Sequence, residues 1–134
     1  MDEKERIRSL MASVKSKNSK AELLVFSYLR NQEVYFQRHY PRAPGKPDIA
    51  LPRKKKAVFI DGDFWHGHDY LRRKPQLNPY WLGKVSNNMK RDIRVNGELQ
   101  STGWEVLRVW ASDINRKRTR DFELERIKKF LLNS

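Results

Sequence analysis

The sequence contains no cysteine, and this absence removes three kinds of chemistry at once. A chain without cysteine forms no disulfide, builds no thiolate zinc site and has no cysteine nucleophile. Long hydrophobic runs are also missing, since no apolar stretch approaches the roughly 20 residues that a membrane-spanning helix needs. We therefore expect a protein without disulfides, without thiolate-bound zinc and without a membrane span.

Acidic residues are scarce relative to basic ones. The 134 residues include 29 lysines and arginines but only 16 aspartates and glutamates, which gives a formal net charge of +13. This excess predicts a polyanionic partner, and nucleic acid is the first candidate. An anionic membrane would need an apolar face or anchor, so we expect no membrane partner. Residues 1–4 begin no hydrophobic signal region, which predicts a cytoplasmic location.

Hydrophobic patterning predicts a single domain over residues 1–134, because a chain of this length buries one core. The expected order is helix, helix, three strands, helix, strand, helix, which is typical of an α/β sandwich with a mixed sheet. Ser19 is expected to cap the second helix, and Glu22 would complete a capping box. We expect helices at about 1–14, 19–29, 80–101 and 120–132, strands at 34–40, 48–51, 57–60 and 104–110, and a long loop over 62–79. The last helix is expected to bury Phe122, Leu124, Ile127, Phe130 and Leu131.

Acidic side chains flank two neighbouring expected strands. Asp48 begins one strand, and Asp61 and Asp63 follow the next, so a short connection between the strands would bring Asp48 near Asp61. Magnesium prefers oxygen ligands and usually takes one or two protein carboxylates. His66 has the side chain that accepts a proton from water near neutral pH. The pattern favours metal-dependent cleavage of a phosphodiester; the alternative is a turn aspartate, a strand-end aspartate and a surface histidine.

Several separated motifs occur in the order of a known family. The sequence resembles the PD-(D/E)xK nuclease superfamily and, more closely, the very short patch repair (Vsr) DNA mismatch endonuclease family. This resemblance implies a restriction-endonuclease-like fold, with a central mixed sheet flanked by helices, in a bacterial-type protein that is associated with the nucleoid when bound. The matching segments are Met11, Ala21-Glu22, Pro44 to Asp48, Val58 to His68, Asn88 to Asp92 and Gly103 to Trp110.

The resemblance also implies roles for single residues. Asp48 is similar to the family's metal-binding aspartate, and the main-chain carbonyl of Ile60 is a further metal contact. His66 matches the histidine that activates the attacking water. The implied cofactor is Mg²⁺, with Mn²⁺ possible, and the implied reaction is a nick in one strand of double-stranded DNA, 5′ of the mispaired T at T:G mismatches.

Further residues match the family's supporting and DNA-contacting positions. Asp92 resembles an acid that supports the site, Glu22 a glutamate on the helix before the sheet, and Asp61 a site residue after the strand. Aromatic and apolar wedges that unstack the mispair are implied for Phe64, Trp65 and Met11. Basic residues expected to contact DNA are Lys46, Arg72, Arg73, Lys90 and Arg91.

One position departs from the family pattern. Family members usually hold a structural zinc with cysteines, one of them between the glycine and the phenylalanine of Gly-x-Phe-Trp-His, and this chain has Asp63 there. His68 lies near a zinc-ligand position, but one histidine and one aspartate do not make a structural site. We therefore expect no structural zinc, and we expect packing, DNA or another ion to order the loop 62–79.

Two classes of function remain open from the sequence. The first is a monomeric Mg²⁺-dependent endonuclease, acting either in mismatch repair or as a site-specific nicking, restriction or homing-type enzyme. The second is a catalytically inactive DNA-binding module. His39 lies outside the motifs and is expected to be structural or solvent-facing. The basic runs 53–56, 72–74 and 116–118 are expected to contact phosphates, with solvated turns as the alternative.

Overall fold

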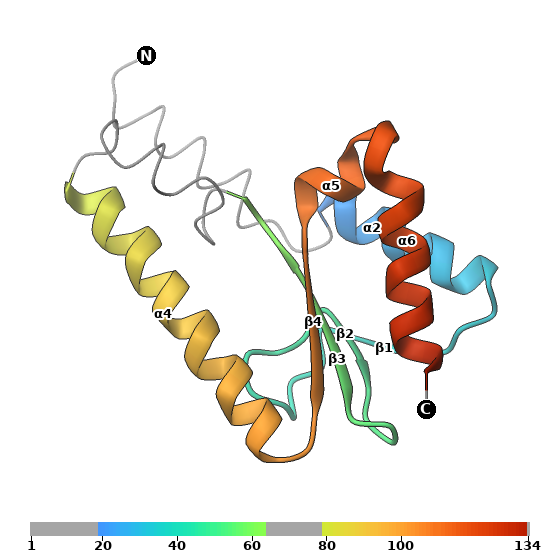
Figure 1. The fold of residues 1–134 in the computed structure, drawn as a ribbon, viewed down its shortest axis with the longest axis horizontal. Helices are drawn as coiled ribbons and strands as arrows, with labels where there is room; N and C mark the ends of the chain where they lie inside the picture. Colours follow the sequence, from blue (N-terminus) through green and yellow to red (C-terminus); the bar gives the residue numbers. More distant parts are fainter. Residues whose placement is uncertain (1–18, 64–78, 134) are drawn as a thin grey trace.

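The structure, a computed structural model, describes residues 19–63 and 79–133 (Figure 1). The expected first helix and most of the loop 62–79 lie outside these residues. So do several of the expected site residues. They are Met11, Phe64, Trp65, His66, Arg72 and Arg73.

Within the described residues, four strands form one mixed sheet in the order β1-β2-β3-β4. Strands β1 (Gln37–Arg38), β2 (Ile49–Leu51) and β3 (Lys56–Asp61) pair antiparallel. The last strand, β4 (Glu105–Trp110), pairs parallel to β3. A parallel pair needs a crossover connection. Here the 23-residue helix α4 (Pro79–Ser101) lies between the two strands in sequence.

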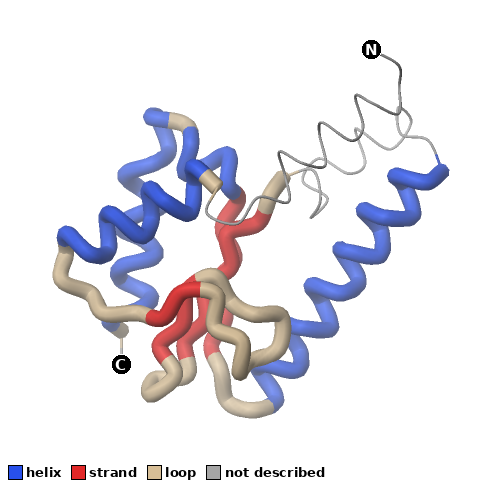
Figure 2. The backbone as a smooth tube through the Cα atoms, turned by 180° about the vertical axis from the view of Figure 1, so that it is seen from behind, coloured by secondary structure: helices blue, strands red, loops and turns tan. Residues whose placement is uncertain are grey.

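Helices cover both faces of the sheet (Figure 1). One face packs against α4, and the other against α2 (Lys20–Asn31), α5 (Ala111–Asn115) and α6 (Lys117–Leu132). Figure 2 shows the same layers from behind. The arrangement confirms the expected α/β sandwich with a mixed sheet and flanking helices, and it is consistent with a restriction-endonuclease-like fold. None of the described helices is long and apolar enough to cross a membrane.

Strand β3 is the centre of the core, and all six of its residues are buried. Successive side chains of a strand point to opposite faces. Val58 and Ile60 therefore join the core beneath α2 and α6, whereas Ala57 and Phe59 pack with α4. This burial on both faces explains the continuous apolar run in the sequence and fixes the position of the acidic residue that ends the strand.

Several element boundaries differ from the expectations. Strand β1 has two residues rather than seven, and it ends at Arg38 because His39 has a left-handed φ of 46° and so leaves the extended conformation. Helix α5 was not expected, and α6 begins at Lys117 rather than near 120. Phe122 is 73% exposed, which is contrary to the expectation that it is buried. It lies two positions from Leu124, on the opposite side of a helix with 3.6 residues per turn.

Candidate metal centre

The start of β2 and the end of β3 lie side by side, as expected from the short connection between them. Ile49 is opposite Val58 in the antiparallel register, so the next step of the ladder brings Asp48 opposite Phe59, next to Ile60. The carboxylate of Asp48 accepts a 2.7 Å hydrogen bond from the main-chain N–H of Ile60. This bond holds one carboxylate oxygen of Asp48 against the backbone of β3, and the backbone therefore sets the orientation of the carboxylate.

Two side chains from other parts of the chain, Glu22 and His39, lie beside Asp48. His39 Nε2 lies 3.1 Å from Glu22 Oε2 and 3.8 Å from Asp48 Oδ1. One ligand atom from each of Glu22, His39 and Asp48 lies within 4.8 Å of the other two. Glu22 comes from α2, where the Ser19 hydroxyl accepts a 3.4 Å hydrogen bond from its N–H, as expected for an N-cap. We call this group the Glu22–His39–Asp48 cluster.

His39 was expected to be structural or solvent-facing, and the structure adds its position within this cluster. Its side chain is 29% exposed and lies beside both carboxylates. The signal that could have found it is strand register: Arg38 pairs with Ile49, so the next step of the same antiparallel ladder brings His39 to Asp48. The main-chain N–H of His39 donates a 3.0 Å hydrogen bond to the carbonyl of Asp48. The sequence alone does not fix that register.

Asp48 is electrostatically unusual. The pKa of its carboxyl group is raised from 3.8 to about 7, mainly by burial and to a smaller extent by the nearby charges of Glu22 and Asp61, while the hydrogen bond from Ile60 N–H lowers it. Among residues 19–63 and 79–133, neither a lysine nor an arginine forms an ion pair with Asp48. A cation bound at this cluster would therefore stabilise the ionised form.

A second acidic group contains its own cation. Arg108 donates from Nη1 to both carboxylate oxygens of Asp61, at 2.9 and 3.1 Å. The same nitrogen lies 3.6 Å from Asp92 Oδ1. Arg108 Nε donates to Asn96 Oδ1 at 2.8 Å, and the guanidinium stacks 4.1 Å above the ring of Phe59. We call this group the Asp61–Asp92–Arg108 cluster.

Sequence reasoning selected Asp61 and Asp92 but missed Arg108. The signal was available as a charged residue within the apolar strand β4, where Arg108 is opposite Phe59 in the parallel register. A cavity of about 260 Å³ opens beside this cluster, between α4 and β4. It is lined by Asp61, Met89, Asp92, Ile93, Arg108, Val109 and Trp110.

Asp63, which stands where the family has a zinc-binding cysteine, has a role in the described structure. Its carboxylate accepts a 3.2 Å hydrogen bond from the N–H of Ser112 in the first turn of α5. A carboxylate that accepts from the N–H groups of a first helical turn is favourable. The chain leaving β3 is thereby joined to α5 by an aspartate.

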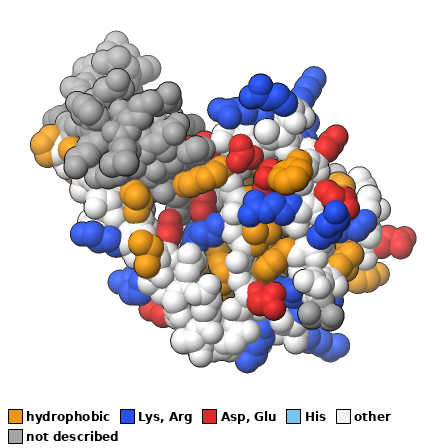
Figure 3. All heavy atoms as spheres, in the orientation of Figure 1, with side chains coloured by type: hydrophobic (Ala, Val, Ile, Leu, Met, Phe, Trp, Pro, Cys, Tyr) orange, Lys and Arg blue, Asp and Glu red, His pale blue; other side chains and the backbone are white. Residues whose placement is uncertain are grey.

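The basic residues expected to contact DNA are divided by the structure. Lys46, Lys90 and Arg91 are exposed, in agreement with a role at a surface. Lys56 is the exception within the run 53–56: it is buried, forms a 2.9 Å ion pair with Glu105 and so is neither a solvated turn residue nor a phosphate contact. Figure 3 shows the basic side chains scattered over one face of the molecule, with acidic side chains between them.

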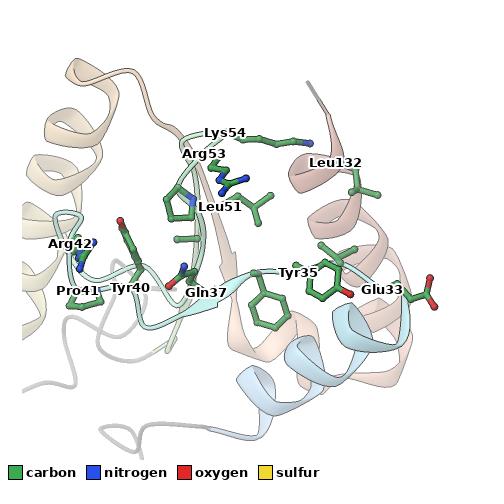
Figure 4. Close-up of a pocket in the computed structure, with 14 residues that line it drawn as sticks. Glu33, Tyr35, Gln37, Tyr40, Pro41, Arg42, Leu51, Arg53, Lys54 and Leu132 are labelled. Carbon is green, nitrogen blue, oxygen red and sulfur yellow. The ribbon is translucent and has the colours of Figure 1, made fainter.

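A groove of about 940 Å³ runs along the β1 edge of the sheet and the turn after β2 (Figure 4). Its floor includes Leu51, and its rim carries Arg42, Arg53 and Lys54. Tyr35 at one end is 90% exposed. Among the described residues that line it, Glu33 is the only acidic one. These lining residues include no group of carboxylates and imidazole, so the candidate chemistry is at the other end of β1 and β2.

Comparisons with known proteins identify the family of this chain. The family model of the DNA mismatch endonuclease Vsr matches residues 1–72, which include all three members of the Glu22–His39–Asp48 cluster. The type II nicking enzyme V.HpaIIP of Haemophilus parainfluenzae is 38% identical over 124 residues, covering 90% of this chain and 87% of that protein.

Two further relatives cover most of the chain. The type II nicking enzyme V.NmeDIP of Neisseria meningitidis serogroup C is 36% identical over 118 residues, which are 86% of this chain and 80% of the relative. The DNA mismatch endonuclease Vsr of Escherichia coli is 33% identical over 102 residues, which are 75% of this chain and 65% of the relative. The match to the family model and the extent of these similarities show that the chain belongs to the Vsr family of DNA mismatch endonucleases.

Proposed function

We propose that the protein is a metal-dependent endonuclease that nicks one strand of double-stranded DNA. The observation that carries the proposal is the Glu22–His39–Asp48 cluster, in which ligand atoms from three parts of the chain lie within 4.8 Å of one another. Its relatives support the same reaction, since they are named as nicking enzymes and as a mismatch endonuclease. The net charge of +13 favours a DNA substrate.

The donor set fits a divalent cation. Asp48 and Glu22 offer carboxylate oxygens, and the raised pKa of Asp48 shows that this buried carboxylate gains from a nearby positive charge. Asp48 and the main-chain carbonyl of Ile60 would hold the ion, and Glu22 would join or support them from α2. The ion would supply Lewis-acid stabilisation of the phosphate and of the attacking oxygen.

The other parts of the nicking reaction would be carried out by side chains of the protein. His66 would take the proton from the attacking water. Asp61 and Asp92 would act through Arg108, which joins them at 2.9 and 3.6 Å and so fixes the end of β3 against α4 and β4. Phe64, Trp65 and Met11 would open the base stack beside a mispair, where unstacking costs least. The basic residues that would contact the DNA backbone are Lys46, Arg72, Arg73, Lys90 and Arg91.

The substrate that we propose first is a duplex with a T:G mismatch, cut 5′ of the mispaired T. The alternative is nicking at a fixed site without a mismatch, as in a restriction or homing-type enzyme. Two of the relatives that cover most of the chain are named as type II nicking enzymes rather than as mismatch endonucleases, and this keeps the alternative open.

A nicking assay tests both the reaction and the substrate. End-labelled duplexes, one fully paired and one with T:G mispairs in varied contexts, are incubated with Mg²⁺ or Mn²⁺ and either the natural protein or Asp48→Asn. We expect a nick beside the mispaired T from the natural protein and none from the variant. Cutting of the paired duplex would support the alternative substrate, and equal cutting by both proteins would refute the proposed metal centre. Binding of both duplexes without any cutting would leave the inactive DNA-binding module.

A further inference from the structure

His39 is the one member of the Glu22–His39–Asp48 cluster that offers nitrogen, and the proposed function so far gives it no role. Its Nε2 lies 3.1 Å from Glu22 Oε2 and 3.8 Å from Asp48 Oδ1, so it faces the same small volume as the two carboxylates. We propose that His39 is a direct nitrogen ligand of the catalytic cation, and that the site therefore prefers a first-row transition cation such as Mn²⁺ to Mg²⁺. This inference rests on the proposed function.

The position of the imidazole is fixed by its surroundings. His39 has a left-handed φ of 46°, a conformation that is uncommon for residues other than glycine. Its main-chain N–H bonds to the carbonyl of Asp48 at 3.0 Å. The edge of its ring packs against Phe26, with ring centroids 5.9 Å apart and an interplanar angle of 79°. A ligand held in this way loses little freedom when an ion binds.

The chemistry of the donor set determines the preferred ion. Mg²⁺ is bound through oxygen ligands and keeps several waters, so an imidazole in its first shell contributes little. Divalent transition ions bind imidazole readily, and their affinity for mixed nitrogen and oxygen sites rises along the first row. One imidazole and two carboxylates therefore select a transition ion over Mg²⁺, and Mn²⁺ is the probe that reports on the ligand directly.

The Asp61–Asp92–Arg108 cluster offers no competing place for the ion. It contains two carboxylates, but Arg108 bonds both oxygens of Asp61 and lies 3.6 Å from Asp92. A cation there would have to displace the guanidinium from its bond to Asn96 and its stacking on Phe59. The proposed site differs from this cluster in two ways. It contains an imidazole, and among the described residues no lysine or arginine forms an ion pair with Asp48.

Pulsed electron paramagnetic resonance of Mn²⁺ bound to the full chain, without DNA, tests the ligand. A coordinated imidazole produces a ¹⁴N coupling on the Mn²⁺ signal. We expect this coupling in the natural protein and its loss in His39→Gln, with Mn²⁺ affinity falling about 10-fold to 100-fold, as for groups that hold a metal site together. Mg²⁺ affinity is expected to fall much less. His66→Gln is the matched control and is expected to keep the ¹⁴N coupling and the Mn²⁺ affinity.

Two results would overturn the inference: no ¹⁴N coupling in the natural protein, or a coupling that persists in His39→Gln. If the persisting coupling is lost in His66→Gln, the nitrogen ligand is His66 instead. An Asp48→Asn variant distinguishes failure of the inference about His39 from failure of the proposed function. If Asp48→Asn neither binds Mn²⁺ nor nicks DNA while His39→Gln keeps the coupling, His39 is not the ligand and the metal centre stands. If Asp48→Asn nicks DNA normally, the metal centre and the inference both fail.

Discussion

Two acidic groups lie at the same end of the sheet, and they differ in how their charge is balanced. In the Asp61–Asp92–Arg108 cluster, a guanidinium bonds Asp61 at 2.9 Å and reaches Asp92 at 3.6 Å. In the Glu22–His39–Asp48 cluster, no described lysine or arginine pairs with Asp48, and the pKa of that carboxyl group is raised to about 7. Neighbouring residues of β3 belong to the two groups: the N–H of Ile60 donates a hydrogen bond to Asp48, and Asp61 accepts hydrogen bonds from Arg108.

We infer from this difference that the Asp61–Asp92–Arg108 cluster is structural and that the Glu22–His39–Asp48 cluster is the proposed metal site. A carboxylate pair with its own arginine is complete without any ligand, and it fixes α4, β3 and β4 relative to one another. A largely buried carboxylate such as Asp48, with which no described lysine or arginine forms an ion pair, is costly in the metal-free protein. That cost is typical of a site whose stabilising partner arrives from solution, and proteins retain such strain where function needs it.

Asp48→Asn has the largest expected effect, and it tests whether the Glu22–His39–Asp48 cluster is needed for nicking. The amide keeps an oxygen to accept the Ile60 N–H bond but gives up the charge that would bind the cation. Because a metal ion supplies several kcal/mol of transition-state stabilisation, we expect nicking to fall about 1000-fold or more. Gel assays measure the rate, and fluorescence anisotropy should show DNA binding nearly unchanged. A variant with full nicking activity would refute the role of Asp48.

Arg108→Ala tests the structural side. Removing the guanidinium leaves Asp61 and Asp92 without their shared cation, and breaking a largely buried pair in this way costs about 3 kcal/mol of unfolding free energy. Urea denaturation followed by circular dichroism measures the loss. The control is Arg108→Met combined with Asp61→Asn, which should recover part of the stability because one uncompensated charge is removed. No recovery would mean that Arg108 stabilises through packing on Phe59 instead.

These two tests concern features that the sequence revealed to different degrees. The apolar runs around Ile49 and Val58 are local signals, so the strands and the approach of Asp48 to the end of β3 could be predicted. The short Pro52 to Lys55 turn also made the pairing of β2 with β3 the natural choice. Predictions succeed here because the interacting residues are close together in the sequence.

Arg108 and His39 could not be placed for a different reason. Arg108 reaches Asp61 through a parallel pairing that joins strands 47 positions apart, and no local pattern encodes that register. His39 reaches Asp48 through the register between β1 and β2, and a two-residue strand followed by a left-handed residue gives no local pattern that predicts this register. The run of basic residues 53–56 places Lys56 in a turn, but Lys56 is buried and forms an ion pair with Glu105 on β4. Tertiary pairing rather than composition decides these positions.

The pH dependence of the unfolding free energy tests the raised pKa of Asp48, and the expected effect is smaller. The pKa of Asp48 in the folded protein, about 7, lies above its ordinary value of 3.8, so the folded chain holds this proton more tightly than the unfolded chain. The stabilising contribution is therefore complete below pH 3.8 and is lost as the pH rises through 7. Metal-free natural protein should lose stability relative to Asp48→Asn over this window.

Thermal or urea unfolding of both proteins at a series of pH values measures that difference. Above pH 7, Asp48→Asn is expected to be the more stable by about 1–2 kcal/mol, a common gain when a strained functional group is replaced. Saturating Mn²⁺ should stabilise the natural protein and not the variant. A constant difference between the two proteins across the pH range would contradict the raised pKa of Asp48.

The groove at the β1 edge should give the smallest effect. Lys54→Glu on its rim reverses an exposed charge that lies far from the two clusters in the fold. If Lys54 contacts a phosphate, DNA affinity should fall a few-fold, and the slope of log affinity against log salt should decrease by about 0.9. Lys129→Glu, an equal change of charge on exposed α6, is the matched control. Equal effects of the two variants would show only a loss of net charge.

The most direct test of the two-cluster account is anomalous X-ray diffraction from crystals of the full chain soaked in Mn²⁺. The account predicts one strong anomalous peak within coordination distance of Glu22, His39 and Asp48, and none between Asp61 and Asp92. A peak between Asp61 and Asp92 with Arg108 displaced, and no peak at Asp48, would contradict it.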